Sequence, residues 1–417
     1  MQVPTGAHIA LMSVPLHGHV NPMLGLATEL KARGHRVTFA TGEDFAPLVE
    51  EAGATAVGYR SGFPSARGGA GDWIPAEDDG TLAVAAFDRE CRTALPQLAE
   101  AYAQDVPELV VYDTVTGCAP LLARRWGAAE VQFSPTHAFP DAVAGPAVGA
   151  GRAALDGTVP CVVAMPRSLQ FRAEEISGRH VFVGPVGGPR RTDGDWAPPR
   201  PGRRCALVSL GTTYNRRTDV FRTCVRALRG LGDDRHVVVA TGHPATTAEL
   251  GDLAGEEGVE VHTWVPQQRV LRHTDVFLTA GGTGSVLEGL AHGVPLVVLP
   301  QAVEQFVTAE RVSALGVGRV LRTLSAAGPD AADEQALTEA VRDLLADDSV
   351  PSRLSALRAE AAAAGGARAA ADVVEAALAR RTELQGRRGR RNGQAGPGGP
   401  GHQEHARHRD DVREEQR

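Results

Sequence analysis

Residues 277–305 read FLTAGGTGSVLEGLAHGVPLVVLPQAVEQ and contain a complete strand–loop–helix–strand unit. An apolar run at 276–282 enters the glycine-rich loop GGTGS. A helical stretch follows, and a second apolar run, PLVVLP, occupies 295–300. Two apolar strands joined through a helix are the pattern of a βαβ unit, so the stretch predicts neighbouring parallel strands with a helix packed on them.

The same pattern extends outward through the second half of the chain. Earlier apolar runs at 205–211, 236–242 and 259–265 predict further strands, each separated by a helical segment. Two helices, at about 331–346 and 351–379, are predicted to close this domain. Beyond Arg380 there are almost no apolar residues, which predicts a disordered polar tail over 381–417.

The first half repeats the alternation of strands and helices. Pro22 is predicted to be the first residue of a helix that runs to Gly34. A second helix is expected near 81–104 and a third at 119–127. Strands are predicted on either side of these helices, at 8–16, 36–40, 108–113 and 131–134. The Gly- and Pro-rich sequence at 185–204 has the composition of an interdomain linker, so we expect two α/β domains with parallel sheets.

Composition narrows the function classes. A length of 417 residues predicts two or three domains, and no apolar run reaches the length of a membrane-spanning helix. The N-terminus lacks the pattern of a secretory signal, so we expect a soluble cytoplasmic protein. The net charge of −7 favours a small-molecule partner over nucleic acid or an anionic membrane. The five cysteines form no CxxC pair, which argues against structural zinc or a disulfide framework.

Two polar residues follow predicted strands of the first domain. His19, in HGHVNP, comes after the first strand, and Asp113 ends a later strand. Ligands of open α/β sheets bind at the carboxyl ends of strands, where an imidazole beside a carboxylate can take a proton from a hydroxyl. The alternative is that His19 caps or packs the following helix and Asp113 is a turn residue. Spacing alone leaves both interpretations open.

A second cluster lies around GGTGS in the second domain. A glycine turn before a helix can bind phosphate through backbone N–H groups. Glu288, on that helix, could bind a ribose diol or be an ordinary exposed acid. Trp264, in TWVPQQRVL (263–271), could stack on a base or pack in the core.

Together these segments resemble the donor signature of GT-B glycosyltransferases of the UDP-glycosyltransferase superfamily, particularly bacterial macrolide and antibiotic glycosyltransferases of the macrolide-inactivating type. The resemblance combines WVPQ, GGTGS, Glu288, GVP and Glu304–Gln305 at similar spacing. HGHVNPMLGLATELKARGHRVTFAT, VPELVVYDTVTGCAPLLARRWG, MPRSLQF, FVGP and VSLGT are also similar to segments of that type. The resemblance therefore covers nearly the whole folded body.

The resemblance implies a role for each matching residue. His19 would be the general base and Asp113 its orienting partner. Trp264 would stack on the nucleobase and the backbone of Val265 would read the edge of that base. Glu288 would bind the ribose hydroxyls. The remaining implied donor-binding residues are Gln267 of the same motif, Gly282, Gly284 and Ser285 at the diphosphate, Ser209, Gly211 and Thr212 near it, and Glu304 with Gln305 on the transferred sugar.

The implied fold is GT-B, with two Rossmann-like α/β domains facing across a cleft. Residues 1–184 would bind the acceptor and 205–380 the nucleotide sugar. The implied reaction is inverting transfer of a hexose from UDP-glucose or a dTDP-deoxysugar to a hydroxyl of a macrolide or similar natural product, in antibiotic biosynthesis or resistance. No metal or other cofactor is implied, in agreement with the absence of a DxD pair in a donor-like context.

Two departures from the family pattern lead to alternatives. Ala280, in TAGGTGS, stands where most relatives carry a His that contacts the diphosphate, and the acceptor region at 141–181 looks shortened. These departures motivate a catalytically weak, nucleotide-sugar-binding helper protein. A GT-B sugar-nucleotide epimerase, which also binds a nucleotide diphosphate between two such domains, is the other alternative.

Overall fold

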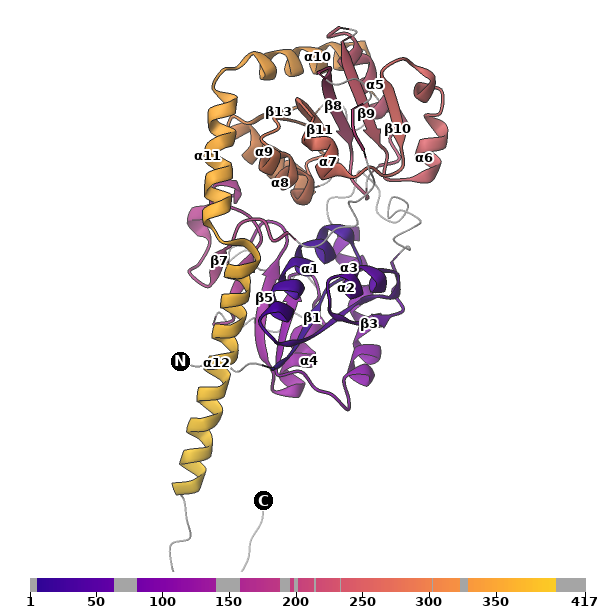
Figure 1. Cartoon of the computed structure of the whole chain (residues 1–417). Helices are drawn as coiled ribbons and strands as arrows, with labels where there is room; N and C mark the ends of the chain where they lie inside the picture. The colour runs from indigo at the N-terminus through magenta and orange to yellow at the C-terminus, as the bar shows by residue number, and fades with distance from the viewer. Residues whose placement is uncertain are drawn as a thin grey trace, which may run out of the picture. The chain divides into compact units, whose positions relative to one another are not determined.

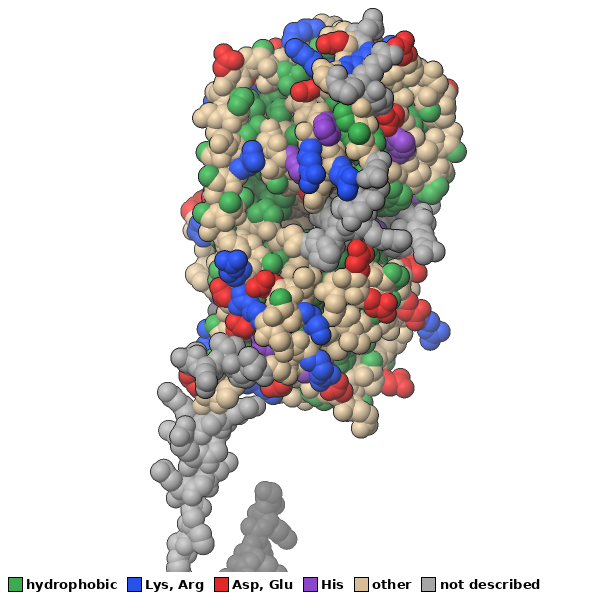
Figure 2. Space-filling view, in the orientation of Figure 1, with side chains coloured by type: hydrophobic (Ala, Val, Ile, Leu, Met, Phe, Trp, Pro, Cys, Tyr) green, Lys and Arg blue, Asp and Glu red, His purple; other side chains and the backbone are tan. Residues whose placement is uncertain are grey.

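The computed structural model describes residues 6–63, 81–139, 158–187, 196–198, 202–213, 215–232, 234–301, 303–322 and 329–394. Residues up to Ala379 form one compact unit that contains two parallel β-sheets (Figure 1). On the face shown in Figure 2, acidic and basic side chains of the described residues are intermixed.

The first sheet has seven parallel strands in the order β3-β2-β1-β4-β5-β6-β7. The strand order reverses between β1 and β4, which pair directly with Met12 opposite Tyr112. The carboxyl ends of these two strands are therefore level at the switch point. The strands are β1 (His8–Met12), β2 (Arg36–Gly42), β3 (Thr55–Tyr59), β4 (Leu109–Asp113), β5 (Ala129–Ser134), β6 (Cys161–Val163) and β7 (His180–Phe182).

The second sheet has six parallel strands in the order β10-β9-β8-β11-β12-β13. Its order reverses between β8 and β11, where Thr279 lies opposite Ser209. The strands are β8 (Arg204–Ser209), β9 (Arg235–Ala240), β10 (Val259–His262), β11 (Val276–Thr279), β12 (Leu296–Val298) and β13 (Gly318–Val320). Each sheet thus has one switch point, the place where ligands bind in open α/β folds.

Helices cover both faces of the first sheet. In β1, Ile9 and Leu11 pack in one buried cluster, while Ala10 and Met12 pack in the cluster on the opposite face. This alternation explains why the strand reads as a continuous apolar run. The helices of this domain are α1 (His17–Ala32), α2 (Ala46–Glu51), α3 (Thr81–Ala101) and α4 (Ala119–Trp126).

The core of the second domain belongs to a third cluster, built around β8, β9, β11 and β12, which also includes Cys161 and Val163 of β6. Its helices are α5 (Thr218–Arg229), α6 (Pro244–Glu249), α7 (Gln267–Leu271), α8 (Thr283–His292), α9 (Val303–Ala314), α10 (Ala331–Ala346) and α11 (Val350–Ala363). The predicted strands of both domains are present, with somewhat different ends.

The C-terminal helices differ from the sequence prediction. The helix expected at 351–379 is interrupted at Gly365 and Gly366, whose φ values of +91° and +56° suit glycine and turn the chain. The following helix, α12 (Gly366–Gln394), packs Val374 and Leu378 in the core of the first domain (Figure 1). Assigning residues up to 380 to the second domain was therefore wrong for this helix, because its apolar face is buried against the first.

Polar contacts strengthen the attachment of α12. Arg33, the C-cap residue of α1, donates to the carboxylates of Asp372, at 2.6 Å, and Glu375, at 2.7 Å. Residues 381–394, predicted to be disordered, continue this helix, and their many arginines are good helix formers. Residues 395–417 lie outside the described residues.

Other differences concern helix starts and short strands. Helix α1 begins at His17, five residues before Pro22, because the Leu16 carbonyl already accepts the N–H groups of His19 and Val20. The sequence analysis missed β3, β6, β7 and β13, of which three have only three residues. Of the region predicted to be shortened, residues 141–157 are not among those described, and 158–181 include β6 and the start of β7.

Candidate active site

His19 and Asp113 meet at the switch point of the first sheet. Asp113 is the last residue of β4, and His19 lies in the first turn of α1, after the loop that leaves β1. The imidazole Nδ1 is 2.7 Å from Oδ2 of Asp113. The structure therefore brings together two residues that are 94 positions apart in the chain.

The Asp113 carboxylate is held by several donors. It has no exposed surface, and it accepts hydrogen bonds from the Thr114 hydroxyl and the Val115 N–H, both at 3.2 Å. The Ser13 hydroxyl lies 3.4 Å from Oδ2. Asp113 thus hydrogen-bonds the turn that follows β4 and also contacts His19. His19 does not cap α1, whose N-cap is Leu16 and has no side-chain hydrogen bond.

The contact with Asp113 sets the protonation of His19. A carboxylate only accepts hydrogen bonds, so Nδ1 carries the proton and Nε2 of the neutral ring has a free lone pair. Burial lowers the pKa of His19, but the charge of Asp113 and its hydrogen bond, with the charge of Glu304, outweigh burial and raise this pKa above its ordinary value. An imidazole held in this way can accept a proton from a hydroxyl.

Aromatic residues that no sequence motif indicated lie near His19. The Phe87 ring of α3 lies 6.2 Å from the His19 ring, and Phe63 meets Phe87 edge-on at 5.8 Å. His17 packs against Phe45 at 4.9 Å and lies 5.6 Å from Trp264 of the second domain. No sequence motif marks Phe63 or Phe87, since they become neighbours only through the fold.

The glycine loop lies at the switch point of the second sheet. It connects β11 to the N-terminus of α8, where Gly282 is the N-cap residue. Glycine is required at 281, because φ is +88° and a Cβ would lie 2.6 Å from Cγ1 of Val298. A Cβ at Gly282 or at Gly284 would meet no atom within 4 Å, so the loop has open space beside it.

This loop has the features of an anion site. The hydroxyl of Thr283 is buried and has no hydrogen-bond partner among the described residues. Backbone N–H groups of the first helical turn and the helix dipole favour a negatively charged group at such a terminus. The partly buried Ser285 lies in the same turn. Ser209 ends β8, the strand that pairs with β11, and Gly211 and Thr212 come directly after that strand.

The surroundings of Glu288 and Trp264 differ from those of an exposed acid and a tryptophan packed in the core. Glu288 is only 8% exposed, and its Oε2 accepts a hydrogen bond from Nε2 of Gln267 at 2.8 Å. It is therefore not an ordinary exposed acid. Trp264 is 55% exposed, so it is not packed in the core. The next residue, Val265, is partly buried against the core of the second domain.

Three further residues singled out in the sequence differ in exposure: Glu304 is exposed, whereas Gln305 and Ala280 are buried. Glu304 is exposed in the first turn of α9 and contributes to the raised pKa of His19. Gln305 is buried, and its side-chain oxygen accepts the N–H of Gln301 at 2.8 Å. Ala280 is 2% exposed and belongs to the core cluster of the second domain.

All five cysteines are free thiols, and four are buried. Among the residues that the structure describes, no group of three or more His, Cys, Asp or Glu side chains is arranged to hold a metal ion. Within the same part of the chain, every helix is too short or too polar to cross a membrane.

Two parallel α/β sheets with helices on their faces, one carrying a His–Asp pair and the other an open glycine loop at its switch point, define a glycosyltransferase of the GT-B class. Residues 227–377 match the family of the erythromycin biosynthesis protein CIII-like C-terminal domain. The chain belongs to the family of macrolide and other antibiotic glycosyltransferases.

Individual relatives support this assignment over nearly the whole length. The chain is 37% identical to the oleandomycin glycosyltransferase of Streptomyces antibioticus, across 91% of this chain and 93% of the relative. It is 35% identical to the demethyllactenocin mycarosyltransferase of Streptomyces fradiae, across 89% and 87%. The crystal structure of the kitacinnamycin glycosyltransferase is 36% identical, with a TM-score of 0.75 over 90% of this chain and 100% of that one.

Proposed function

We propose that this glycosyltransferase moves a hexose from a nucleotide sugar to a hydroxyl of a macrolide or similar natural product, with inversion at the anomeric carbon. The observation that carries the proposal is the 2.7 Å contact between His19 Nδ1 and Asp113 Oδ2 at the first switch point. It leaves Nε2 of His19 free to accept a proton.

In the proposed reaction, the acceptor hydroxyl gives its proton to Nε2 of His19 as its oxygen attacks the anomeric carbon. The new carbon–oxygen bond forms on the face opposite the nucleotide, and the bond to the diphosphate breaks with its electron pair. Asp113 stabilises the imidazolium that results. An α-linked donor therefore becomes a β-glycoside and a free nucleoside diphosphate.

The donor would bind at the second switch point. The unpartnered Thr283 hydroxyl and the N-terminus of α8 support a site for the diphosphate, whose charge grows as the sugar leaves. The exposed Trp264 ring supports stacking on the base, and the Glu288 carboxylate supports binding of the ribose hydroxyls. UDP-glucose and dTDP-deoxysugars are the proposed donors. No metal is needed in this scheme.

The acceptor would bind beside His19 in the first domain. The partly buried rings of Phe63 and Phe87 lie next to the base and offer an apolar wall. Such a wall suits the large apolar surface of a polyketide ring. The names of the relatives point in the same direction, since one is an oleandomycin glycosyltransferase and another acts on demethyllactenocin.

A turnover screen tests the proposal. The full chain is incubated with UDP-glucose or dTDP-rhamnose and with oleandomycin or demethyllactenocin, and products are detected by mass spectrometry. NMR of the product then gives the anomeric configuration. We expect a β-linked product from an α-linked donor and none with His19→Ala. An α-linked product from UDP-glucose, whose sugar is α-linked, would refute inversion, and equal turnover by His19→Ala would refute the role of the base.

A further inference from the structure

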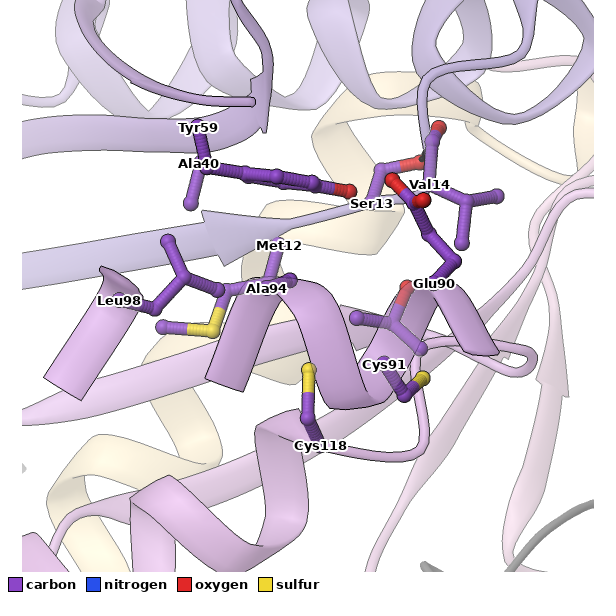
Figure 3. A pocket seen from close by; sticks show the side chains of 11 residues that line it. Met12, Ser13, Val14, Ala40, Tyr59, Glu90, Cys91, Ala94, Leu98 and Cys118 are labelled. Atoms are coloured by element: carbon purple, nitrogen blue, oxygen red, sulfur yellow. Dashed lines mark hydrogen bonds between the residues drawn. The ribbon is translucent and has the colours of Figure 1, made fainter. Parts of the chain in front are cut away.

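A second buried carboxylate, that of Glu90, lies in the first domain near His19 and Asp113. Glu90 belongs to α3 and is 2% exposed. Its Oε1 accepts the Ser61 hydroxyl at 2.6 Å, and its Oε2 accepts the N–H of Gly62 at 2.7 Å. Figure 3 shows the Tyr59 hydroxyl directed toward the same carboxylate, with Ser13 beside them in the wall of one pocket. Glu90 therefore attaches α3 to the segment that follows β3.

The hydrogen bonds of Glu90 are strong and well protected. Burial first, then the charge of Glu90 and the hydrogen bond to it, raise the pKa of Tyr59 well above its ordinary value, so Tyr59 is a neutral donor. The carboxylate thus receives hydrogen bonds from Ser61 and Gly62, and the neutral Tyr59 hydroxyl is directed toward it. Hydrogen bonds to a buried charge are stronger than those between neutral groups.

The attached segment carries Phe63. Its N–H donates to the Ser61 hydroxyl at 2.9 Å, the same hydroxyl that binds Glu90. Its ring meets the ring of Phe87, which lies three residues before Glu90 on α3 and therefore on the same side of that helix. Phe87 in turn lies beside His19. A chain of contacts thus connects Glu90 with the apolar wall next to the base.

We propose that Glu90 is a positioning residue, which holds Phe63 against Phe87 and so shapes the acceptor-binding wall beside His19. This inference rests on the proposed function, because it takes the acceptor to bind against these rings. Glu90 has no contact with the reacting atoms. It acts by fixing the residues that contact the apolar part of the acceptor.

A carboxylate is required for this task. Gln has one accepting oxygen, so Glu90→Gln would turn an NH₂ group toward either the Ser61 hydroxyl or the Gly62 N–H. One of these two donors would then lose its carboxylate partner, and the loop that carries Phe63 would loosen. The charges that raise the pKa of His19 are those of Asp113 and Glu304, so the substitution should leave the pKa of the base unchanged.

Steady-state kinetics with UDP-glucose and oleandomycin test this role. We expect Glu90→Gln to raise the KM for oleandomycin about tenfold, the effect of losing one strong hydrogen bond, with little change in the KM for UDP-glucose. The matched control is Gln97→Ala, since Gln97 also attaches α3 to this segment but binds the backbone of Arg60. An equal rise for the control, or a shifted pH profile for Glu90→Gln, would overturn the proposal.

A double-mutant cycle with Phe63→Leu shows whether Glu90 acts through Phe63. If it does, the two substitutions together raise the KM for oleandomycin no more than the larger single effect. Additive effects would overturn the proposal. If Glu90→Gln fails to fold, Ser61→Ala replaces it, because it removes the hydroxyl that connects Glu90 with the N–H of Phe63.

Hydrogen exchange of the full chain supplies a readout that needs no substrate. The amides of Gly62 and Phe63 should exchange faster in Glu90→Gln than in the wild type, while amides of the second sheet keep their rates. Unchanged exchange at these amides would refute the role of Glu90 in fixing this segment. If the wild type is inactive but exchange is faster in Glu90→Gln, the proposed function and the acceptor role are refuted. The role of Glu90 in fixing the segment that carries Phe63 is then still supported. An active wild type with an unchanged KM in Glu90→Gln would refute this inference alone.

Discussion

The carboxylate of Asp113 is completely buried, whereas the His19 side chain bound to it keeps 17% of its surface exposed. The pair therefore has a closed side and an open side. The charge that raises the pKa of the imidazole is shielded from water, and the ring still has surface at which a substrate can arrive. In the proposed reaction, this asymmetry separates the orienting carboxylate from the reacting imidazole.

Replacing His19 by Ala should lower the rate of transfer by about 10²–10⁴-fold, the usual contribution of a general base. Binding of UDP or dTDP, measured by calorimetry, should remain nearly the same, because the donor motif belongs to the second domain. His262→Ala is a suitable control, since His262 is a half-exposed histidine bonded to Glu260. Near-normal turnover in His19→Ala would remove the assignment.

The pH dependence should report the pKa of His19. Because the neutral ring is the active form and its pKa lies above 6.5, kcat/KM should rise with pH through a midpoint above 6.5. Asp113→Asn removes the charge that raises this pKa and leaves burial, which lowers it. The midpoint should then move to lower pH while the maximal rate falls, since Asn no longer enforces the Nδ1–H tautomer. A midpoint that stays in place would show that another group titrates.

The same shift predicts how stability depends on pH. A group whose folded-state pKa is raised stabilises the fold below its unfolded pKa, near 6.5, and loses this contribution as pH rises through the folded pKa. Urea unfolding at several pH values should show this loss in the wild type. The loss should disappear in His19→Ala.

Trp264→Ala should weaken binding of UDP or dTDP without unfolding the protein. Stacking of a base on an aromatic ring contributes about 1–3 kcal/mol, and the ring is 55% exposed, so little core packing is lost. Calorimetry and thermal unfolding measure the two quantities. A large drop in thermal stability would instead point to a structural role. Val106→Ala provides a control for removal of an exposed side chain.

Glu288→Ala should weaken nucleotide binding by about 1.5–3 kcal/mol, the range for a hydrogen bond to a charged group. The loss should be much smaller for a 2′,3′-dideoxynucleotide, which lacks the hydroxyls that Glu288 is proposed to bind. An equal loss for both nucleotides would contradict this role. Gln267→Ala is the companion variant, since it removes the donor that holds Glu288 in place.

Helix α12 should stabilise the first domain. Val374 is fully buried there, so Val374→Ala should lower the free energy of unfolding by about 2 kcal/mol. The neighbouring Val373 is only partly buried, and Val373→Ala should cost less. Hydrogen exchange can show which sheet is affected. Faster exchange confined to the second sheet would contradict the packing described here.

The strand pattern and the donor motif could be recognised in the sequence because they are local. Strands buried on both faces must be apolar at every position, so β1, β4, β8, β9 and β11 stand out as continuous apolar runs. The GGTGS loop could be recognised because its glycines stand between an apolar run and a helical stretch, and glycine at 281 is required by a φ of +88°. A strand of three residues has too few apolar positions to be recognised from the sequence, so β6, β7 and β13 were not predicted.

Only the tertiary structure determined which residues that are distant in the sequence come into contact. The sequence contained His19 and Asp113 but left their contact open, because only the pairing of β1 with β4 brings their ends level. It placed α12 with its neighbours in sequence, although the helix crosses back to bury its apolar face in the first domain. The link from Glu90 through Phe63 and Phe87 to His19 has no motif at all. Apolar periodicity specifies which face of an element is buried, and only the folded chain specifies what covers that face.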